Sequence, residues 1–269
     1  MNGIAPNNPG SIISMGASCF VSYADEATVL KGYEIWVNGR RKSYYERDCE
    51  DALSREEVVY RHLGQHPQIL RCFGREEVAP GIHSLRLELA PLGNVRQYIR
   101  QHSESHVPMR TRLQMCVDIS GGLSYIHSKK IQHCDLSCRN FLLFPKLRVK
   151  IGDFGGAMIE GHNFRPNVCE ESHYELPCRG RKFNERPPIK RELFALGCAI
   201  YEVVAWKKPF GELEDEEVEA RYDREEFPSL LGIKASHVIW NCWNERYDSA
   251  EQVMDALMEC MSKKYSENT

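Results

Sequence analysis

The amino-acid sequence predicts an α+β protein of two lobes, a small β-rich lobe with one main helix and a larger, mostly helical lobe. Two observations lead to this prediction. Up to residue 90 the chain contains short apolar runs separated by turn residues, whereas beyond it long segments have helical periodicity. The run Pro91-Leu92-Gly93-Asn94 breaks the pattern between these parts, and we expect the hinge of the molecule there.

Composition argues against several classes of protein. Of the 269 residues, 42% are apolar and 27% charged, as in an ordinary globular protein with a sizeable core. The formal net charge of −3 gives no general attraction to nucleic acid or to an anionic membrane. No apolar run reaches the roughly 18 residues of a membrane span, and the first ten residues do not resemble a signal peptide. We therefore expect an intracellular protein, cytoplasmic or nuclear, with no nucleic-acid partner and no membrane span.

The 11 cysteines are odd in number and scattered, which predicts reduced thiols rather than a disulfide framework. Cys134 and Cys138, near His133, come closest to a zinc site. Because no second ligand pair has the usual spacing, the sequence does not favour zinc.

The small lobe is predicted to contain strands and one helix. Residues 13–31 should form three strands, and the turn Asp25-Glu26 separates the last two, 20–24 and 27–31. Residues 84–90 alternate as a further strand does, and residues 51–63 carry the apolar stripe of a helix. The members of that stripe are Leu53, Val59, Tyr60 and Leu63.

Glu56 falls inside the apolar stripe of this predicted helix. A carboxylate on a packing face is costly unless it is paired, and Lys31 is the expected partner. Two alternatives stay open, a lysine that is solvated at its strand end and a glutamate that reaches water. Lys42 is a rival lysine, but its basic run resembles an exposed loop.

The stretch from Ile131 to Gly155 contains two short apolar runs, 141–144 and 147–151, around Pro145 and Lys146. Such runs predict an antiparallel hairpin. Asn140 precedes its first strand and Asp153 follows its second, so both side chains should meet at the open end.

An amide oxygen and a carboxylate side by side suit Mg²⁺, which takes a few hard oxygen ligands. Asp135, on the preceding loop, is then available as a base beside the metal. The alternative is a structural hairpin with polar residues on its surface.

The larger lobe is predicted to be helical. Residues 111–127 have a broad apolar face, and residues 192–206 are apolar nearly all round, as in a buried helix. Residues 212–226 are acidic and should form a solvated helix face, and residues 239–257 should form the last helices. Between Asp153 and Pro188 the chain is irregular, as a regulatory loop would be.

The order of these motifs resembles the catalytic loop and metal-binding motif of the protein kinase superfamily. His133-Cys134-Asp135 stands where that family usually has His-Arg-Asp, and Asn140 and Asp153-Phe154-Gly155 match outright. The resemblance implies transfer of the γ-phosphoryl group of Mg·ATP to a Ser/Thr or Tyr hydroxyl of a protein, with a monomer expected. Among kinases, the chain is most similar to tyrosine-kinase-like proteins and to a divergent group of single-domain fungal kinases.

The resemblance also implies a role for each matched residue. Asp135 would be the catalytic base, and Asn140 and Asp153 the magnesium ligands. Lys31, positioned by Glu56, would contact the phosphates, and Arg139 would steady the transferring group. Besides Lys31, the nucleotide site would include Ile13, Gly16, Val21, Val29, Leu87, Glu88, Ala90 and Leu142.

The implied organisation is a flexible extension over residues 1–12, a kinase domain over 13–262 and a tail over 263–269. Within the domain, residues 13–87 would form the N-lobe, 88–94 the hinge and 95–262 the C-lobe.

The sequence departs from the family pattern in its loops. Only Gly16 of the usual three phosphate-loop glycines is present, because Ser14 and Cys19 replace the others. Cys134 replaces the arginine that clamps a phosphorylated activation loop, which predicts activity independent of such phosphorylation. Arg139 follows Asp135 by four residues, as in tyrosine kinases.

Two further departures concern the second lobe. Glu175-Leu176-Pro177 is the nearest match to Ala-Pro-Glu, and no clear arginine partner for its glutamate is found late in the chain. Glu192 stands where the family has an aspartate that braces the catalytic loop through backbone hydrogen bonds. We expect the structure to accommodate the one extra methylene group of the glutamate.

Alternatives to a protein kinase remain open. The phosphate loop with only one of its usual glycines and the missing Ala-Pro-Glu also fit a pseudokinase that serves as a binding module. A small-molecule kinase of the aminoglycoside or choline type is the third hypothesis. Ser172 and Tyr174 are possible phosphorylation sites. A basic cluster could dock acidic groups, although a solvated surface is favoured. Its members are Arg179, Arg181, Lys182, Arg186, Lys190 and Arg191.

Overall fold

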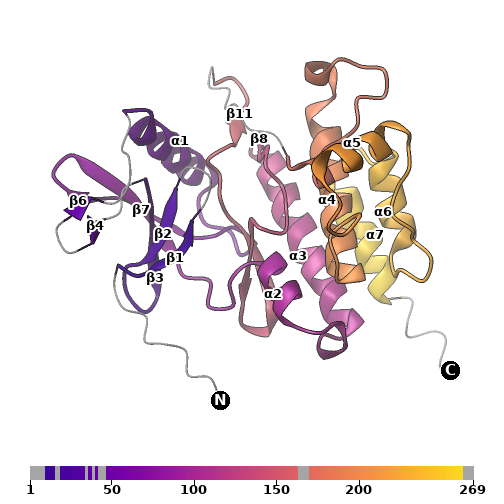
Figure 1. The fold of residues 1–269 in the computed structure, drawn as a ribbon, viewed down its shortest axis with the longest axis horizontal. Coiled ribbons are helices and arrows are strands. Elements are labelled where there is room, and N and C mark those ends of the chain that lie inside the picture. Colours follow the sequence, from indigo (N-terminus) through magenta and orange to yellow (C-terminus); the bar gives the residue numbers. More distant parts are fainter. Residues whose placement is uncertain are drawn as a thin grey trace. The chain divides into compact units, whose positions relative to one another are not determined.

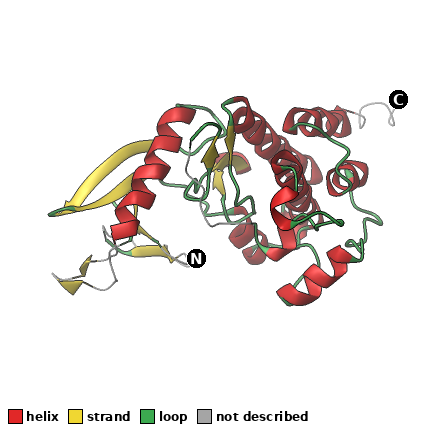
Figure 2. Ribbon diagram, turned by 90° about the horizontal axis from the view of Figure 1, so that it is seen from above, coloured by secondary structure: helices red, strands yellow, loops and turns green. Residues whose placement is uncertain are grey.

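A computed structural model describes residues 10–15, 19–33, 36–37, 40–41, 47–162 and 170–262. The chain divides into two compact units. The first comprises residues 1–66 and 70–89, and the second comprises 67–69 and 90–269. Figure 1 labels most of the helices and strands of each unit, and Figure 2 distinguishes the helices from the strands.

The first unit contains a five-stranded antiparallel sheet in the order β1-β2-β3-β7-β6. Its strands are β1 (Ile12–Met15), β2 (Phe20–Tyr23), β3 (Thr28–Gly32), β6 (Cys72–Ala79) and β7 (Ile82–Glu88). A separate ribbon pairs β4 (Trp36–Val37) with β5 (Arg40–Arg41). The sequence predicted all of the sheet except β6, whose alternating polar and half-buried residues give a weak apolar signal.

The turn between β2 and β3 is built by one side chain. The Asp25 carboxylate accepts hydrogen bonds from the backbone N–H groups of Ala27 and Thr28, both at 2.8 Å, and from the Thr28 hydroxyl at 2.7 Å. Asp25 therefore satisfies the polar groups of the turn as an aspartate commonly does. The predicted turn at this place is confirmed.

Helix α1 (Arg47–Leu63) is the one helix of the first unit among the described residues. It begins four residues earlier than predicted. The predicted stripe is buried, since Leu53, Val59, Tyr60 and Leu63 are each at most 5% exposed. These side chains cover the sheet through contacts of α1 with β6 and β7.

The second unit is mostly helical (Figure 2). Its α-helices are α2 (Val95–Gln101), α3 (Met109–Ser128), α4 (Pro188–Ala205), α5 (Asp215–Asp223), α6 (Ser236–Trp243) and α7 (Ala250–Ser262). Short 3₁₀ turns are η1 (Glu104–His106), η2 (Pro145–Leu147), η3 (Ser172–Tyr174) and η4 (Phe183–Glu185). Two ribbons pair β8 (Ile131–Gln132) with β11 (Met158–Ile159) and β9 (Phe141–Phe144) with β10 (Arg148–Ile151). This helical unit and the sheet of the first unit confirm the predicted α+β class.

Helix α4 lies at the centre of the second unit, as its apolar sequence predicted. It packs against α3 on one side and against α6 on another, and α7 packs on α3. Every residue from Glu192 to Val204 is buried. None of the described helices has both the length and the apolar character that crossing a bilayer requires.

The close approach of α4 to α6 requires a glycine. A Cβ atom at Gly197 would lie 2.5 Å from Cβ of Cys242 and 3.3 Å from Cδ1 of Trp243. We expect Gly197→Ala to lower the free energy of unfolding by about 1 to 3 kcal/mol, because the two helices must separate. Urea unfolding followed by circular dichroism measures this change.

Gly121→Ala on α3 is the matched control. Its Cβ would meet the sulfur of the flexible Met254 side chain at 3.3 Å, and alanine favours a helix over glycine by up to about 1 kcal/mol. The control should therefore be nearly neutral. Equal stability of Gly197→Ala and the wild type would show that the interface tolerates a methyl group.

Candidate active site

Lys31 and Glu56 form a buried ion pair within the first unit. The Lys31 ammonium nitrogen, on β3, lies 2.9 and 2.7 Å from the two carboxylate oxygens of Glu56, on α1. Their side chains are 6% and 1% exposed. The predicted pairing therefore occurs, and neither the solvated lysine nor the water-exposed glutamate is found. A rigid ammonium group held in this way suits contact with phosphate oxygens.

The other predicted nucleotide contacts of the first unit lie on its sheet. Val21 pairs with Lys31, and Val29 pairs with Leu87. The remaining members of that set are Ile13 on β1 and Glu88 on β7, while Gly16 and the rival Lys42 lie outside the described residues. Ala90 and Leu142 belong to the second unit. Their contacts with a nucleotide stay predictions.

The hairpin predicted between Asn140 and Asp153 is confirmed. Strands β9 and β10 pair in antiparallel register from Phe144–Arg148 to Phe141–Ile151. The second strand is one residue shorter than predicted. Leu147 belongs to the turn, where it and Lys146 take φ values of 54° and 63°. At the open end, the Gly152 N–H donates to the Asn140 carbonyl at 2.9 Å.

Asn140 and Asp153 both interact with Asp135 at this end of the hairpin. The Asn140 amide nitrogen donates to the backbone carbonyl of Asp135 at 2.7 Å and to its carboxylate at 3.1 Å. Burial raises the pKa of Asp135, and the negative charge of Asp153 raises it further. The structure thus brings together the three residues that the sequence singled out.

These donors fit a magnesium ion. Because the Asn140 amide nitrogen points to Asp135, its oxygen is the atom left for a cation, and Asp153 supplies a carboxylate. The charge of Asp153 raises the pKa of Asp135, and a cation between the two carboxylates would relieve this repulsion. Amide and carboxylate oxygens are ligands that Mg²⁺ takes in proteins.

The His133 ring links the backbone at Asp135 to the backbone at Gly152, next to Asp153. Its fully buried ring donates through Nε2 to the Gly152 carbonyl at 3.0 Å, and its Nδ1 accepts from the Asp135 N–H at 3.3 Å. The ring also lies 5.1 Å from that of the buried Phe154. One imidazole therefore fixes the backbone beside both Asp135 and Asp153.

Glu192, at the start of the buried part of α4, braces the catalytic loop as expected. Its Oε1 accepts from the backbone N–H groups of His133 at 2.5 Å and of Cys134 at 2.8 Å. Its Oε2 lies 2.6 Å from Nε2 of His127. Burial opposes ionisation, but the hydrogen bond and charge of His127 and the loop N–H groups hold the pKa of Glu192 below its ordinary value.

Cys134, in place of the family arginine, takes a φ of 64° and is buried. Burial raises the pKa of its thiol strongly, and it raises that of Cys138 as well. Both sulfurs face backbone carbonyls, of Gln132 and Ala199 respectively. Protonated, buried thiols of this kind are structural side chains and poor zinc ligands.

Glu175 pairs with Arg186, which is close in sequence, rather than with an arginine late in the chain. The two side chains lie 2.8 Å apart, and the Arg186 guanidinium also contacts the Leu176 carbonyl and lies over the Phe183 ring at 4.0 Å. Late in the chain the structure shows an acidic residue, Glu245, in contact with arginines of the earlier segment. There Glu245 lies 2.7 Å from Arg179 and 2.8 Å from Arg181.

The members of the basic cluster that follows Asp153 are paired with carboxylates, and all but Lys182 are buried or half-buried, so the cluster is less solvated than expected. Besides the three arginines above, Lys190 contacts Asp248 at 2.7 Å, and Arg191 contacts the buried Glu170 at 2.6 Å. Lys182 is the exposed member, with Glu185 3.6 Å away. Because each member has a carboxylate partner, the cluster leaves little charge to dock an external acidic group.

Tyr174 is fully buried, and its hydroxyl donates to Glu202 at 2.6 Å. It is therefore not accessible to a modifying enzyme in this conformation. Ser172 is partly exposed and donates to Glu219 at 3.0 Å.

The brace by Glu192 can be tested by mutation. In Glu192→Ala the buried N–H groups of His133 and Cys134 lose their acceptor, and we expect the free energy of unfolding to fall by about 3 kcal/mol. Glu192→Asp, which keeps the charge, should lose less. Urea unfolding at neutral pH measures both, and a Glu192→Ala variant as stable as the wild type would contradict the assignment.

The same brace predicts a pH dependence. Because the folded protein holds the pKa of Glu192 below its ordinary 4.5, the stabilisation is complete above that value and is lost as pH falls through the lowered pKa. The difference in stability between wild type and Glu192→Gln should therefore shrink in acid. A difference that grows below pH 4.5 would have the wrong sign.

Comparisons with known proteins agree with this geometry. Residues 34–267, most of the chain, match the family model described as the protein kinase domain. The chain is 30% identical to mitogen-activated protein kinase kinase kinase 20 of Arabidopsis thaliana over 168 residues, which cover 58% of this chain and 47% of that protein.

Two more Arabidopsis thaliana proteins are similar over longer stretches. Serine/threonine/tyrosine-protein kinase HT1 is 24% identical over 213 residues, covering 74% of this chain and 53% of that protein. Serine/threonine-protein kinase CTR1 is 26% identical over 236 residues, covering 84% and 28%. The chain thus spans about half the length of the first two relatives. Because the family model covers most of the sequence and agrees with the fold and with the catalytic loop, the chain belongs to the protein kinase domain family.

Proposed function

We propose that the protein is an ATP-dependent kinase that transfers the γ-phosphoryl group of Mg·ATP to a hydroxyl group of a protein. The observation that carries this proposal is the convergence of Asn140 and Asp153 on Asp135 at the end of the β9–β10 hairpin. The buried pair of Lys31 and Glu56 supports it independently from the first unit.

The residues have distinct roles in this proposal. Asp135 accepts the proton of the acceptor hydroxyl and orients it for attack on the γ-phosphorus. Asn140 and Asp153 hold the metal, which when bound neutralises charge on the phosphates. Lys31 contacts the α- and β-phosphates, with its ammonium group held by Glu56. Arg139 faces the transferring group with a side chain that is 52% exposed.

The acceptor amino acid is left open between Ser/Thr and Tyr. Arg139 stands where tyrosine kinases carry their arginine, whereas CTR1, a relative, is by name a serine/threonine-protein kinase. Phosphoamino-acid analysis of a peptide library labelled from γ-³²P ATP decides between them.

Activity should not require phosphorylation of the segment after Asp153. Cys134 offers no charge to clamp a phosphate there, and the segment is already held by the ion pair of Glu170 with Arg191.

A pseudokinase is the second candidate, favoured by the replacement of two phosphate-loop glycines by Ser14 and Cys19. Side chains at these positions restrict the backbone conformations that glycine allows. A pseudokinase would give little or no phosphotransfer.

Asp153→Asn should abolish Mg·ATP turnover, because the neutral amide cannot hold the metal as a carboxylate does. The measurement is transfer of labelled γ-phosphate to a mixed peptide library by matched wild-type and variant preparations. Wild-type protein with no transfer above that of the variant would exclude the kinase activity and favour the pseudokinase.

Binding of the nucleotide can be tested without turnover. We expect ATP to raise the melting temperature only when Mg²⁺ is present, by roughly 5 to 10 °C at about one hundred times the dissociation constant. A thermal-shift assay with ATP, ATP plus Mg²⁺, and Mg²⁺ alone measures this. An equal shift with and without Mg²⁺ would contradict the metal-dependent site.

A further inference from the structure

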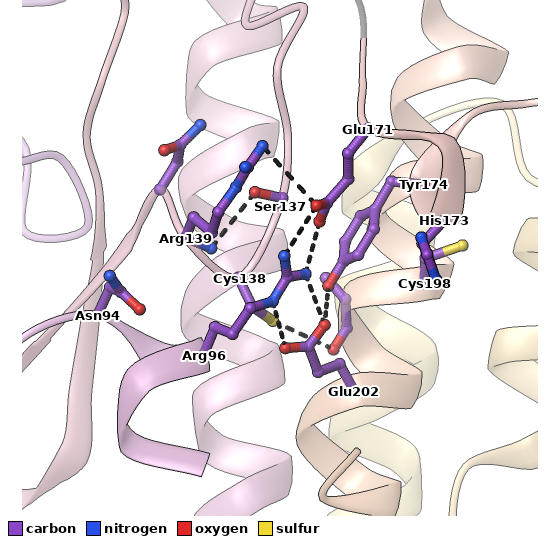
Figure 3. Close-up of polar contacts among 12 residues, drawn as sticks. Asn94, Arg96, Ser137, Cys138, Arg139, Glu171, His173, Tyr174, Cys198 and Glu202 are labelled. Carbon is purple, nitrogen blue, oxygen red and sulfur yellow. Dashed lines mark hydrogen bonds and ion pairs between the residues drawn. The ribbon is translucent and has the colours of Figure 1, made fainter. Parts of the chain in front are cut away.

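A chain of alternating charges in the second unit leads from its buried interior to the catalytic loop (Figure 3). It begins at Glu202 on α4, which is 1% exposed and holds the buried Arg96 of α2 through two hydrogen bonds, both of 2.8 Å. Arg96 in turn lies 2.6 and 2.9 Å from the two carboxylate oxygens of Glu171. Arg96 is thereby held by two contacts to Glu202, and Glu171 is held by two contacts to Arg96.

Glu171 belongs to the segment between Asp153 and α4, and in this chain it lies between Arg96 and Arg139. Burial opposes its ionisation, but the hydrogen bond and charge of Arg96, and the charges of Arg139 and Lys208, lower its pKa. The carboxylate is therefore ionised at neutral pH. Its Oε2 lies 3.7 Å from the Arg139 guanidinium, at the outer end of the chain.

Arg139 needs such a support. Its backbone is fixed, because its N–H donates to the Ser137 hydroxyl at 3.3 Å and the preceding Cys138 carbonyl accepts from the Arg96 N–H at 3.0 Å. Its side chain is half exposed, and an exposed arginine samples many rotamers unless a partner selects one. Glu171 is a carboxylate whose own position is set from beneath by Arg96.

We propose that Glu171 is a positioning residue for phosphoryl transfer, which acts by holding the Arg139 guanidinium where it faces the transferring group. This inference rests on the proposed kinase function. It also makes the placement of the segment after Asp153 a condition for catalysis, because displacement of Glu171 releases Arg139.

Kinetic coupling tests the proposal. The variants are Glu171→Gln, Arg139→Ala and their double mutant, with Glu219→Gln as the matched control. Glu219 is exposed and contacts Ser172, the residue that follows Glu171 in the sequence. Among the described residues it contacts no arginine. We expect Glu171→Gln to lower kcat about tenfold to a hundredfold with KM for ATP unchanged, as a misplaced catalytic group does. The double mutant should be no slower than Arg139→Ala alone, and the control should match the wild type.

Two kinetic outcomes overturn the proposal. If the losses of the two single variants multiply in the double mutant, Glu171 acts independently of Arg139. If Glu171→Gln keeps the wild-type kcat, Glu171 does not position a group that takes part in the reaction.

A second measurement does not depend on activity. Phenylglyoxal modifies accessible arginines, and the rate at Arg139, followed by peptide mass spectrometry, should rise severalfold in Glu171→Gln. The exposed Arg61, which pairs with Glu57, should react at an unchanged rate and serves as the internal control. If the rate of phenylglyoxal modification at Arg139 is unchanged, the proposed contact between Glu171 and Arg139 is overturned. A raised rate in a protein without phosphotransfer would mean that the kinase assignment fails while the contact stands.

Discussion

The active site of this protein depends on one buried carboxylate. Glu192 accepts the N–H groups of two consecutive residues, His133 and Cys134, from the central helix of the second unit. Consecutive N–H groups can point to one acceptor where the backbone turns sharply, and Cys134 takes a positive φ at this turn. The turn directs Asp135 toward Asn140, and the ring of His133 ties the same loop to Gly152, next to Asp153. The proposed base and metal ligands therefore lie around a single anchored loop, and His127 contacts the Glu192 carboxylate that anchors it.

Internal ion pairs fix the segment that follows Asp153-Phe154-Gly155. Glu170 and Glu171 each reach an arginine of a helix, Arg191 and Arg96 respectively. Further along, Arg179 and Arg181 contact Glu245, which lies beyond α6. Several of these pairs are nearly dry, so removal of one partner would leave an uncompensated charge. The segment is thus held by charged side chains of the protein itself.

Local patterns allowed the sequence to predict the sheet turn, the β9–β10 hairpin, the apolar stripe of α1 and the buried helix α4. Asn140 and Asp153 could be predicted to meet because the hairpin between them has a simple register. The pairing of Lys31 with Glu56 followed from a carboxylate on an apolar face. The charge network could not be predicted in this way. Arg96 and Arg186 are nearly as buried as core leucines, yet a sequence pattern alone assigns an arginine to the surface. Several partners of the basic residues lie far away in the sequence, so only the tertiary structure shows that the cluster is paired and largely half-buried. A signal was nevertheless present, since Glu170 and Glu171 are adjacent carboxylates in a segment rich in arginine.

The central claim is that a short β-hairpin delivers an amide and a carboxylate to one divalent cation beside Asp135. A crystal structure of the protein with Mn²⁺ and a non-hydrolysable ATP analogue, with anomalous data collected at the manganese edge, tests it most directly. The account predicts an anomalous peak within coordinating distance of both the Asn140 amide oxygen and the Asp153 carboxylate. A nucleotide bound with its metal away from both side chains, or no anomalous peak at the hairpin, would contradict it.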